Sequence, residues 1–170
     1  MKAVGVVLGT LLALALQTTL NRYVGSGVLA VDLVLVVVVY VALTSGPETG
    51  LLTGAFAGLV QDALSTTGLI GVGGLAKTFV GFLAGIVATQ FIVTQPIPRF
   101  VVFFAASMVH SVLFIGLYAI LDPRRFGVPY MVLAGQALGN AVVGIVAFQL
   151  AEVLPGAVER RRAAKGRLRR

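Results

Sequence analysis

The sequence predicts an all-α integral membrane protein, folded as a compact bundle of six transmembrane helices. Of its 170 residues, 58% are hydrophobic and only 11% are charged, and the mean hydropathy is +1.02. Soluble domains carry about 25% charged residues, so this chain has too little polar surface to cover a globule in water. Six apolar segments also approach the roughly 20 residues that a helix needs to cross a bilayer core of about 30 Å.

The first three expected spans each have a distinguishing sequence feature. The first is a retained span, because the QTTLNRY that follows it lacks the small-residue pattern of a signal-peptide cleavage site. The second contains LVLVVVVYVAL, which would suggest a strand in a soluble protein but here predicts a lipid-exposed helix. Ser45-Gly46-Pro47-Glu48 has the spacing of a capping box before the third. The spans are expected at 3–20, 28–44, 47–64, 69–93, 97–121 and 128–154.

Short turns and a basic tail complete the expected organisation. QPIPR at 95–99 and DPRR at 122–125 separate the last three spans, and Pro155-Gly156 is expected to end the sixth. A transmembrane domain then covers 1–154, and a basic, disordered cytoplasmic tail covers 155–170. Connections this short make neighbouring spans antiparallel.

Most of the net charge of +7 belongs to this tail, because seven of the 13 Lys and Arg residues lie between Arg160 and Arg170. The basic residues flank apolar segments, so the expected partner is membrane lipid and not nucleic acid. The tail either binds lipid or only anchors the topology. The positive-inside rule places it, and with six spans both termini, on the cytoplasmic side. A five-span alternative, with a re-entrant third segment, moves the N-terminus outside.

Three charged side chains are expected in the outer half of the membrane. Asp62 lies two residues before the outer end of the third span, and Lys77 lies about 12 Å below the boundary on the fourth. The helix dipole disfavours a carboxylate in a last turn but favours Asp32 in the first turn of the second span. Because a charge in hydrocarbon costs at least about 2.5–3.5 kcal/mol, we predict an Asp62–Lys77 ion pair, with Asp32 as a further member of the cluster. In the alternative, Asp62 reaches interfacial water and Lys77 extends to lipid phosphate.

Glycines recur at helical spacing on three spans. Such bare faces let helix backbones approach closely in lipid, where hydrophobicity does not drive helix association. Packing within the chain is favoured over a dimerisation face, and a homodimer is the alternative. The predicted packing glycines are Gly50, Gly54 and Gly58 on the third span, Gly81 and Gly85 on the fourth, and Gly135 and Gly139 on the sixth.

Few side chains are suited to catalysis or metal binding. The chain has no cysteine and one histidine, His110, which excludes thiolate chemistry and a His-based metal cluster within one chain. A single histidine inside a bundle is more typical of hydrogen-bonded packing than of a proton shuttle. Gln136 and Asn140, four apart on one helix face, are expected to bond to a neighbouring helix. Without a nucleophile and base or a phosphate loop, the sequence predicts no enzyme, no cofactor and no metal site.

Two stretches, VDLVLVVVVYVAL at 31–43 and GLLTGAFAGLVQDALSTTGLIGVGGLAKTFVGFLAG at 50–85, resemble the rod-shape-determining protein MreD family of bacteria. That family opens its second span with Pro-Asp-Leu, continues with a G-x-x-x-G-F-x-x-G-L-x-x-D core, and follows with Ala-Lys-Thr-hydrophobic-Gly. Two positions depart from the pattern: Val31 replaces the usual Pro, and Ala57 stands near where a bulkier residue is common. The matching positions are Asp32, Gly54, Gly58, Asp62, Lys77, Thr78 and Gly81.

The resemblance implies a non-enzymatic scaffold of the bacterial inner membrane, within the cell-elongation complex that builds lateral peptidoglycan and sets rod shape. It implies direct binding of MreC, with MreB, RodA and a class B penicillin-binding protein in the wider assembly. It also implies a fold similar to the substrate-binding subunits of energy-coupling-factor transporters, which supplies an alternative function as a vitamin-binding subunit. With no Trp and four Tyr, the chain is poorly suited to a vitamin pocket, and a proton-coupled transporter would need more intramembrane carboxylates.

Overall fold

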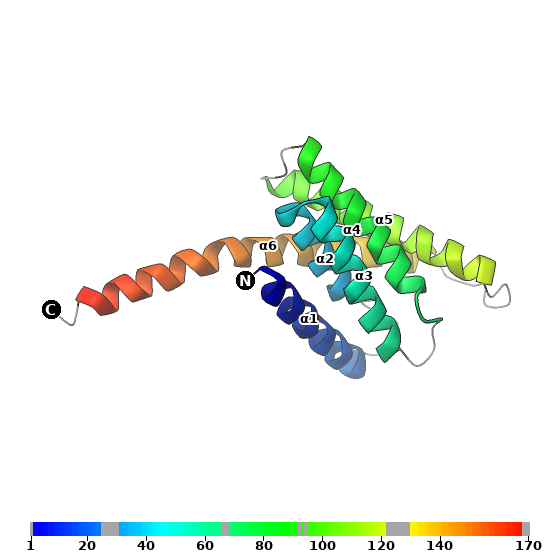
Figure 1. The fold of residues 1–170 in the computed structure, drawn as a ribbon, viewed down its shortest axis with the longest axis horizontal. Helices are drawn as coiled ribbons and strands as arrows, with labels where there is room; N and C mark the ends of the chain where they lie inside the picture. The colour runs from blue at the N-terminus through cyan, green and yellow to red at the C-terminus, as the bar shows by residue number, and fades with distance from the viewer. Residues whose placement is uncertain are drawn as a thin grey trace.

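In the computed structural model, residues 2–24, 31–65, 69–91, 93, 95–121 and 130–167 are described, and they form six α-helices (Figure 1). Strands are absent from these ranges, so the all-α class is confirmed. The helices are α1 (Lys2–Val24), α2 (Leu33–Ser45), α3 (Pro47–Leu64), α4 (Val72–Gln90), α5 (Pro96–Leu121) and α6 (Tyr130–Arg167).

Helix α2 is the centre of the bundle and begins later than expected. Residues 28–30 lie outside the described part of the chain, and α2 begins only after Asp32, whose side chain accepts a hydrogen bond from the Leu35 N–H at 2.9 Å. The buried aliphatic side chains between Val34 and Val39 each have at most 3% of their surface exposed. Helix α2 also contacts all five other helices. The prediction of a lipid-exposed helix is therefore wrong. The unbroken apolar run reflects a helix surrounded by protein.

Helix α6 continues beyond the point at which it was expected to end. It runs through Pro155 and Gly156 to Arg167, and its C-terminal part extends away from the bundle (Figure 1). A proline removes one backbone hydrogen bond and bends a helix, but the helix can resume beyond it. The expected end at Pro155-Gly156 is therefore wrong, while the division into a domain at 1–154 and a tail at 155–170 stays a prediction.

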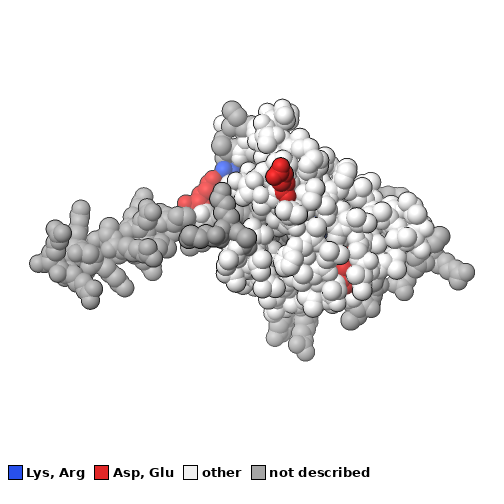
Figure 2. All heavy atoms as spheres, viewed as in Figure 1, with Lys and Arg blue, Asp and Glu red and all other residues white. Residues whose placement is uncertain are grey.

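Several helices have the length and composition of membrane spans. Three stretches, Val72–Gln90, Pro96–Leu121 and Met131–Val153, are long and apolar enough to cross a membrane, and Val4–Leu20 and Leu33–Ser45 are shorter apolar stretches. In Figure 2 the visible surface of the described residues is almost entirely uncharged. These features are those of a helical membrane protein.

Helices α3 and α4 lie antiparallel and in close contact along their whole length. A Cβ built on Gly85 of α4 would meet the backbone of Pro47 at the start of α3, and one built on Gly58, near the end of α3, would lie 2.6 Å from the Cα of Gly74. We call this contact the glycine seam. Its members are Gly50, Gly54 and Gly58 of α3, and Gly73, Gly74, Gly81 and Gly85 of α4.

Candidate functional site

A buried ion pair joins the start of α2 to α4. The Lys77 Nζ lies 2.7 Å from the Asp32 Oδ2, and the two side chains are only 3% and 6% exposed. The other carboxylate oxygen of Asp32 accepts the hydrogen bond from Leu35 that caps α2. Asp32 therefore stabilises the positive end of the α2 dipole and the lysine charge at the same time.

His110 of α5 is the third member of this cluster. Its Nε2 lies 3.2 Å from the Lys77 Nζ. An ammonium group has donors only, so Nε2 is the acceptor and the neutral ring carries its proton on Nδ1. The ring stacks on Phe114, which packs against Tyr118, and the Tyr118 hydroxyl accepts a hydrogen bond from the Leu69 N–H at 2.8 Å. His110 is hydrogen-bonded, as expected, and one face of α5 connects the cluster to the segment before α4.

Asn140 brings α6 into the same network. Its Oδ1 accepts a hydrogen bond from the Asp32 backbone N–H at 2.8 Å, and its Nδ2 donates to the Ser107 Oγ of α5 at 2.7 Å. Asn140 and Ser107 are each 1% exposed. The prediction that Asn140 bonds to a neighbouring helix is confirmed, and Gln136 lies half-buried one turn away. The buried polar cluster, formed by Asp32, Lys77, His110, Ser107 and Asn140, thus ties four helices together.

Asp62 is not part of the buried polar cluster. Its Oδ2 accepts hydrogen bonds from the backbone N–H groups of Gly71 at 2.9 Å and Gly74 at 3.0 Å. The predicted Asp62–Lys77 pair is therefore wrong, because the ion-pair partner of Lys77 is Asp32. Asp62 does avoid an unpaired charge, but the N-terminus of α4 supplies the positive partner, through unsatisfied N–H groups and the helix dipole.

The glycine seam determines where Lys77 can lie. A Cβ on Gly54 would meet the carbonyl oxygen of Lys77 and would lie 2.6 Å from its carbonyl carbon, and a Cβ on Gly50 would lie 3.0 Å from the carbonyl carbon of Gly81. Only glycine permits this approach, which fixes the backbone of Lys77 against α3. The contact with α3 therefore fixes the backbone position from which the Lys77 side chain extends into the buried polar cluster.

The two glycines predicted on α6 differ from each other. A Cβ on Gly139 would lie 2.9 Å from the Val31 Cγ2, so this glycine makes room for the segment before α2. A Cβ on Gly135 would meet nothing within 4 Å. Within the described part of this chain, Gly135 therefore packs against no other helix. Glycine spacing along a helix does not reveal whether another helix faces it, and a role for Gly135 in a homodimer stays a prediction.

A second ion pair, which the sequence did not suggest, lies between α5 and α6. Arg99 donates two hydrogen bonds to Glu152, from Nη2 to Oε1 at 2.6 Å and from Nη1 to Oε2 at 3.2 Å. The sequence pattern places Arg99 only in the turn at 95–99. The available signal was Glu152, a carboxylate within an otherwise apolar segment, where charges usually have a partner.

The contacts of these groups are those of helix packing. Within the described ranges, His, Asp and Glu side chains form no group of three that could hold a metal ion. In the buried polar cluster, each named side chain bonds to another member or to nearby backbone, and the members come from four helices. A network of this kind fixes helix orientation.

Comparison with known families matches residues 2–153 to the family described as rod shape-determining protein MreD. Among curated proteins and among solved structures, no match was found. The expected similarity to the substrate-binding subunits of energy-coupling-factor transporters therefore stays a prediction.

Proposed function

Because the chain belongs to the family of the rod shape-determining protein MreD, we propose that it is a non-enzymatic scaffold of the bacterial inner membrane within the cell-elongation complex. Membership gives it a role in rod shape determination. The proposal adds that the chain supports lateral peptidoglycan synthesis by holding partner proteins, without a reaction of its own.

The buried polar cluster is the observation that carries this proposal. Lys77 bonds to both Asp32 and His110, and Asn140 bonds to both Asp32 and Ser107, so four helices are held in one arrangement. Polar groups that are satisfied inside a low-dielectric interior favour one specific packing over others. A rigid bundle with an apolar outer surface is suited to presenting fixed membrane-embedded faces to a partner.

The proposed topology has six spans with both termini in the cytoplasm. The antiparallel contact of α3 with α4 along its whole length supports a full crossing by α3 over a re-entrant segment. Helix α2 has 13 residues and covers about 20 Å, so a crossing here also requires the chain before Asp32. The seven basic residues between Arg160 and Arg170 support a cytoplasmic C-terminus.

The proposed direct partner is MreC, with MreB, RodA and a class B penicillin-binding protein in the wider assembly. The test is affinity purification of the tagged full chain from solubilised membranes, followed by quantitation of MreC and of bound small molecules. We expect near-stoichiometric MreC. Recovery of a stoichiometric vitamin without MreC would instead support the alternative of a vitamin-binding subunit.

A matched pair of variants makes this test sharper. Gly54→Ala disturbs the glycine seam, whereas Gly135→Ala adds the same methyl group in open space. If a rigid bundle presents the partner-binding face, MreC recovery falls for Gly54→Ala and is unchanged for Gly135→Ala at equal amounts of protein. Equal recovery from both variants, with Gly54→Ala measurably destabilised, would contradict the rigid-platform part of the proposal.

A further inference from the structure

A hollow of about 470 Å³ lies at the end of the bundle where α4 ends and α5 begins. Its walls include Leu43, Phe91, Phe148, Arg99 and Glu152. We propose that this hollow binds the phosphate headgroup of an anionic phospholipid, which takes the place of the Glu152 carboxylate on Arg99. This inference goes beyond the scaffold function and does not depend on it.

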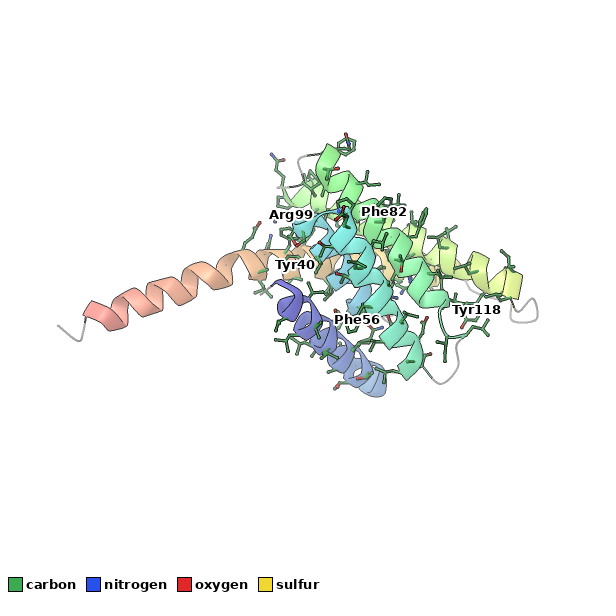
Figure 3. The ribbon with its side chains drawn as sticks, viewed as in Figure 1. Tyr40, Phe56, Phe82, Arg99 and Tyr118 are labelled. Carbon is green, nitrogen blue, oxygen red and sulfur yellow. The ribbon has the colours of Figure 1, made fainter. Side chains whose placement is uncertain are left out.

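Arg99 is a fixed part of the wall. Its side chain is 7% exposed, its Nε–H donates to the Val93 carbonyl at 3.2 Å, and its guanidinium carbon lies 3.8 Å from the centre of the Phe148 ring. Phe148 is held in turn by an edge contact with Tyr40, with ring centres 4.9 Å apart. Figure 3 labels Arg99 and Tyr118, which lie near opposite ends of α5. Arg99 therefore presents a preorganised planar donor, the geometry that suits phosphate.

Glu152 is the exchangeable member of the pair. Its side chain is 54% exposed, whereas that of Arg99 is almost fully covered. A carboxylate with half of its surface exposed can move into water at little desolvation cost, but a buried guanidinium cannot leave. An incoming phosphate could accept the same two hydrogen bonds that Glu152 accepts now.

The electrostatic surroundings favour an anion at this place. Arg99 lies in the first turn of α5, which contains no acidic residue, so the positive end of the helix dipole adds to the guanidinium charge. On α6, Glu152 is followed by the basic segment that holds seven Lys and Arg residues between 160 and 170. Basic segments next to a membrane concentrate anionic lipids.

The position and the apolar walls favour a phospholipid over free phosphate. The apolar stretches of the neighbouring helices end at Gln90 and Val153 and begin at Pro96, so Arg99 lies near the boundary where lipid phosphates are found. Leu43, Phe91 and Phe148 give the hollow apolar surface that can cover the first part of an acyl chain. A volume of 470 Å³ is within the range of ligand sites, roughly 300–1,000 Å³.

The experiment is native mass spectrometry of the full chain in detergent, titrated with phosphatidylglycerol or phosphatidylcholine. We expect the unaltered chain to bind phosphatidylglycerol about fivefold or more tightly than phosphatidylcholine. Arg99→Gln should lose this preference. Glu152→Gln removes the competing charge and should strengthen phosphatidylglycerol binding. Arg99→Lys, which retains the charge without the bidentate donor, should bind phosphatidylglycerol more tightly than Arg99→Gln does and more weakly than the unaltered chain does.

Two controls separate this site from other sources of binding. The triple variant Arg160→Gln, Arg161→Gln and Arg162→Gln tests the contribution of the basic segment. We expect this variant to retain a preference for phosphatidylglycerol, and adding Arg99→Gln should remove that preference. Inorganic phosphate without lipid tests for a free anion. If phosphate alone protects the unaltered chain against thermal unfolding as well as phosphatidylglycerol does, the phospholipid assignment is overturned.

Arg99→Gln and Glu152→Gln must also change the affinity for phosphatidylglycerol in opposite directions. If Glu152→Gln binds phosphatidylglycerol no better than the unaltered chain, or loses binding together with Arg99→Gln, the pair is only structural and the proposal fails. Where Arg99→Gln does not fold, Glu152→Gln decides alone: stronger binding supports the site, and unchanged or weaker binding overturns it.

Discussion

The ion pair of Asp32 and Lys77 leads to a quantitative prediction about stability. Asp32→Asn removes the charge but retains the cap of α2, because Asn is as good an N-cap residue as Asp. Lys77→Met removes the ammonium group and retains most of the apolar stem. The two charges are 2.7 Å apart, so their attraction is about 6 kcal/mol at an effective dielectric constant of about 20. Desolvation offsets much of this, and loss of one partner from a buried pair costs about 3–5 kcal/mol.

We expect each single change to lower the free energy of unfolding by about 3–5 kcal/mol. The double variant should lose at least about 2 kcal/mol less than the sum of the two single losses, because it leaves no unpaired charge. Lys77→Met should be the more damaging single change, since the ammonium also bonds to His110. The assay is reversible unfolding of the full chain in mixed micelles, followed by circular dichroism.

Asp62→Asn provides the matched control for this double-mutant cycle. Asp62 bonds to the start of α4 and not to the lysine, so its loss should add to that of Lys77→Met within about 0.5 kcal/mol. Additivity between Asp32 and Lys77 within the same margin would refute the reasoning. Coupling between Asp62 and Lys77 as strong as that between Asp32 and Lys77 would refute it equally.

Three further predictions concern the surrounding contacts. Gly54→Ala places a Cβ 2.6 Å from a carbonyl carbon of α4 and should cost about 1–3 kcal/mol, whereas Gly135→Ala should be neutral or gain about 0.5–1 kcal/mol; equal melting temperatures would contradict the seam. Asp62→Ala, which removes the accepting oxygens, should cost about 1 kcal/mol and speed amide hydrogen exchange in the first turn of α4, and unchanged exchange there would argue against the cap. Asn140→Leu leaves the backbone N–H that opens α2 without its acceptor and should cost about 1–3 kcal/mol; thermal unfolding at wild-type temperature would contradict this bond.

Local patterns were sufficient to predict the helices and the close approach of α3. The run of Gly50, Gly54 and Gly58 has the spacing of one helix face, and that face lies against α4 in the structure. The same spacing at Gly135 does not correspond to a packing contact within the described chain, because a helix pattern says which residues share a face but not what faces them. The end of α6 also escaped prediction, since a single proline does not decide whether a helix resumes.

The partners of the charged groups depend on tertiary structure, and the sequence could not supply them. Depth in the membrane and adjacency of spans favour an Asp62–Lys77 pair, but backbone N–H groups can also satisfy a carboxylate, and at Asp62 they do. One local signal was available: Asp32 directly precedes an apolar run, which is an N-cap pattern, and it would have placed the start of α2 at Leu33. Arg99 and Glu152 are 53 residues apart, and only the packing of α5 on α6 brings them together.

The glycine seam has a consequence for the biogenesis of the protein. Helix α3 has three glycines, two carboxylates and a proline, and it is not among the apolar stretches that could cross a membrane by composition. A segment of this kind leaves the translocon for lipid poorly by itself. Because α4 covers its glycine face and Asp62 binds the start of α4, the two helices are suited to enter the bilayer together as one hairpin. If α3 crosses the bilayer as proposed, insertion and folding become a single step for this part of the chain.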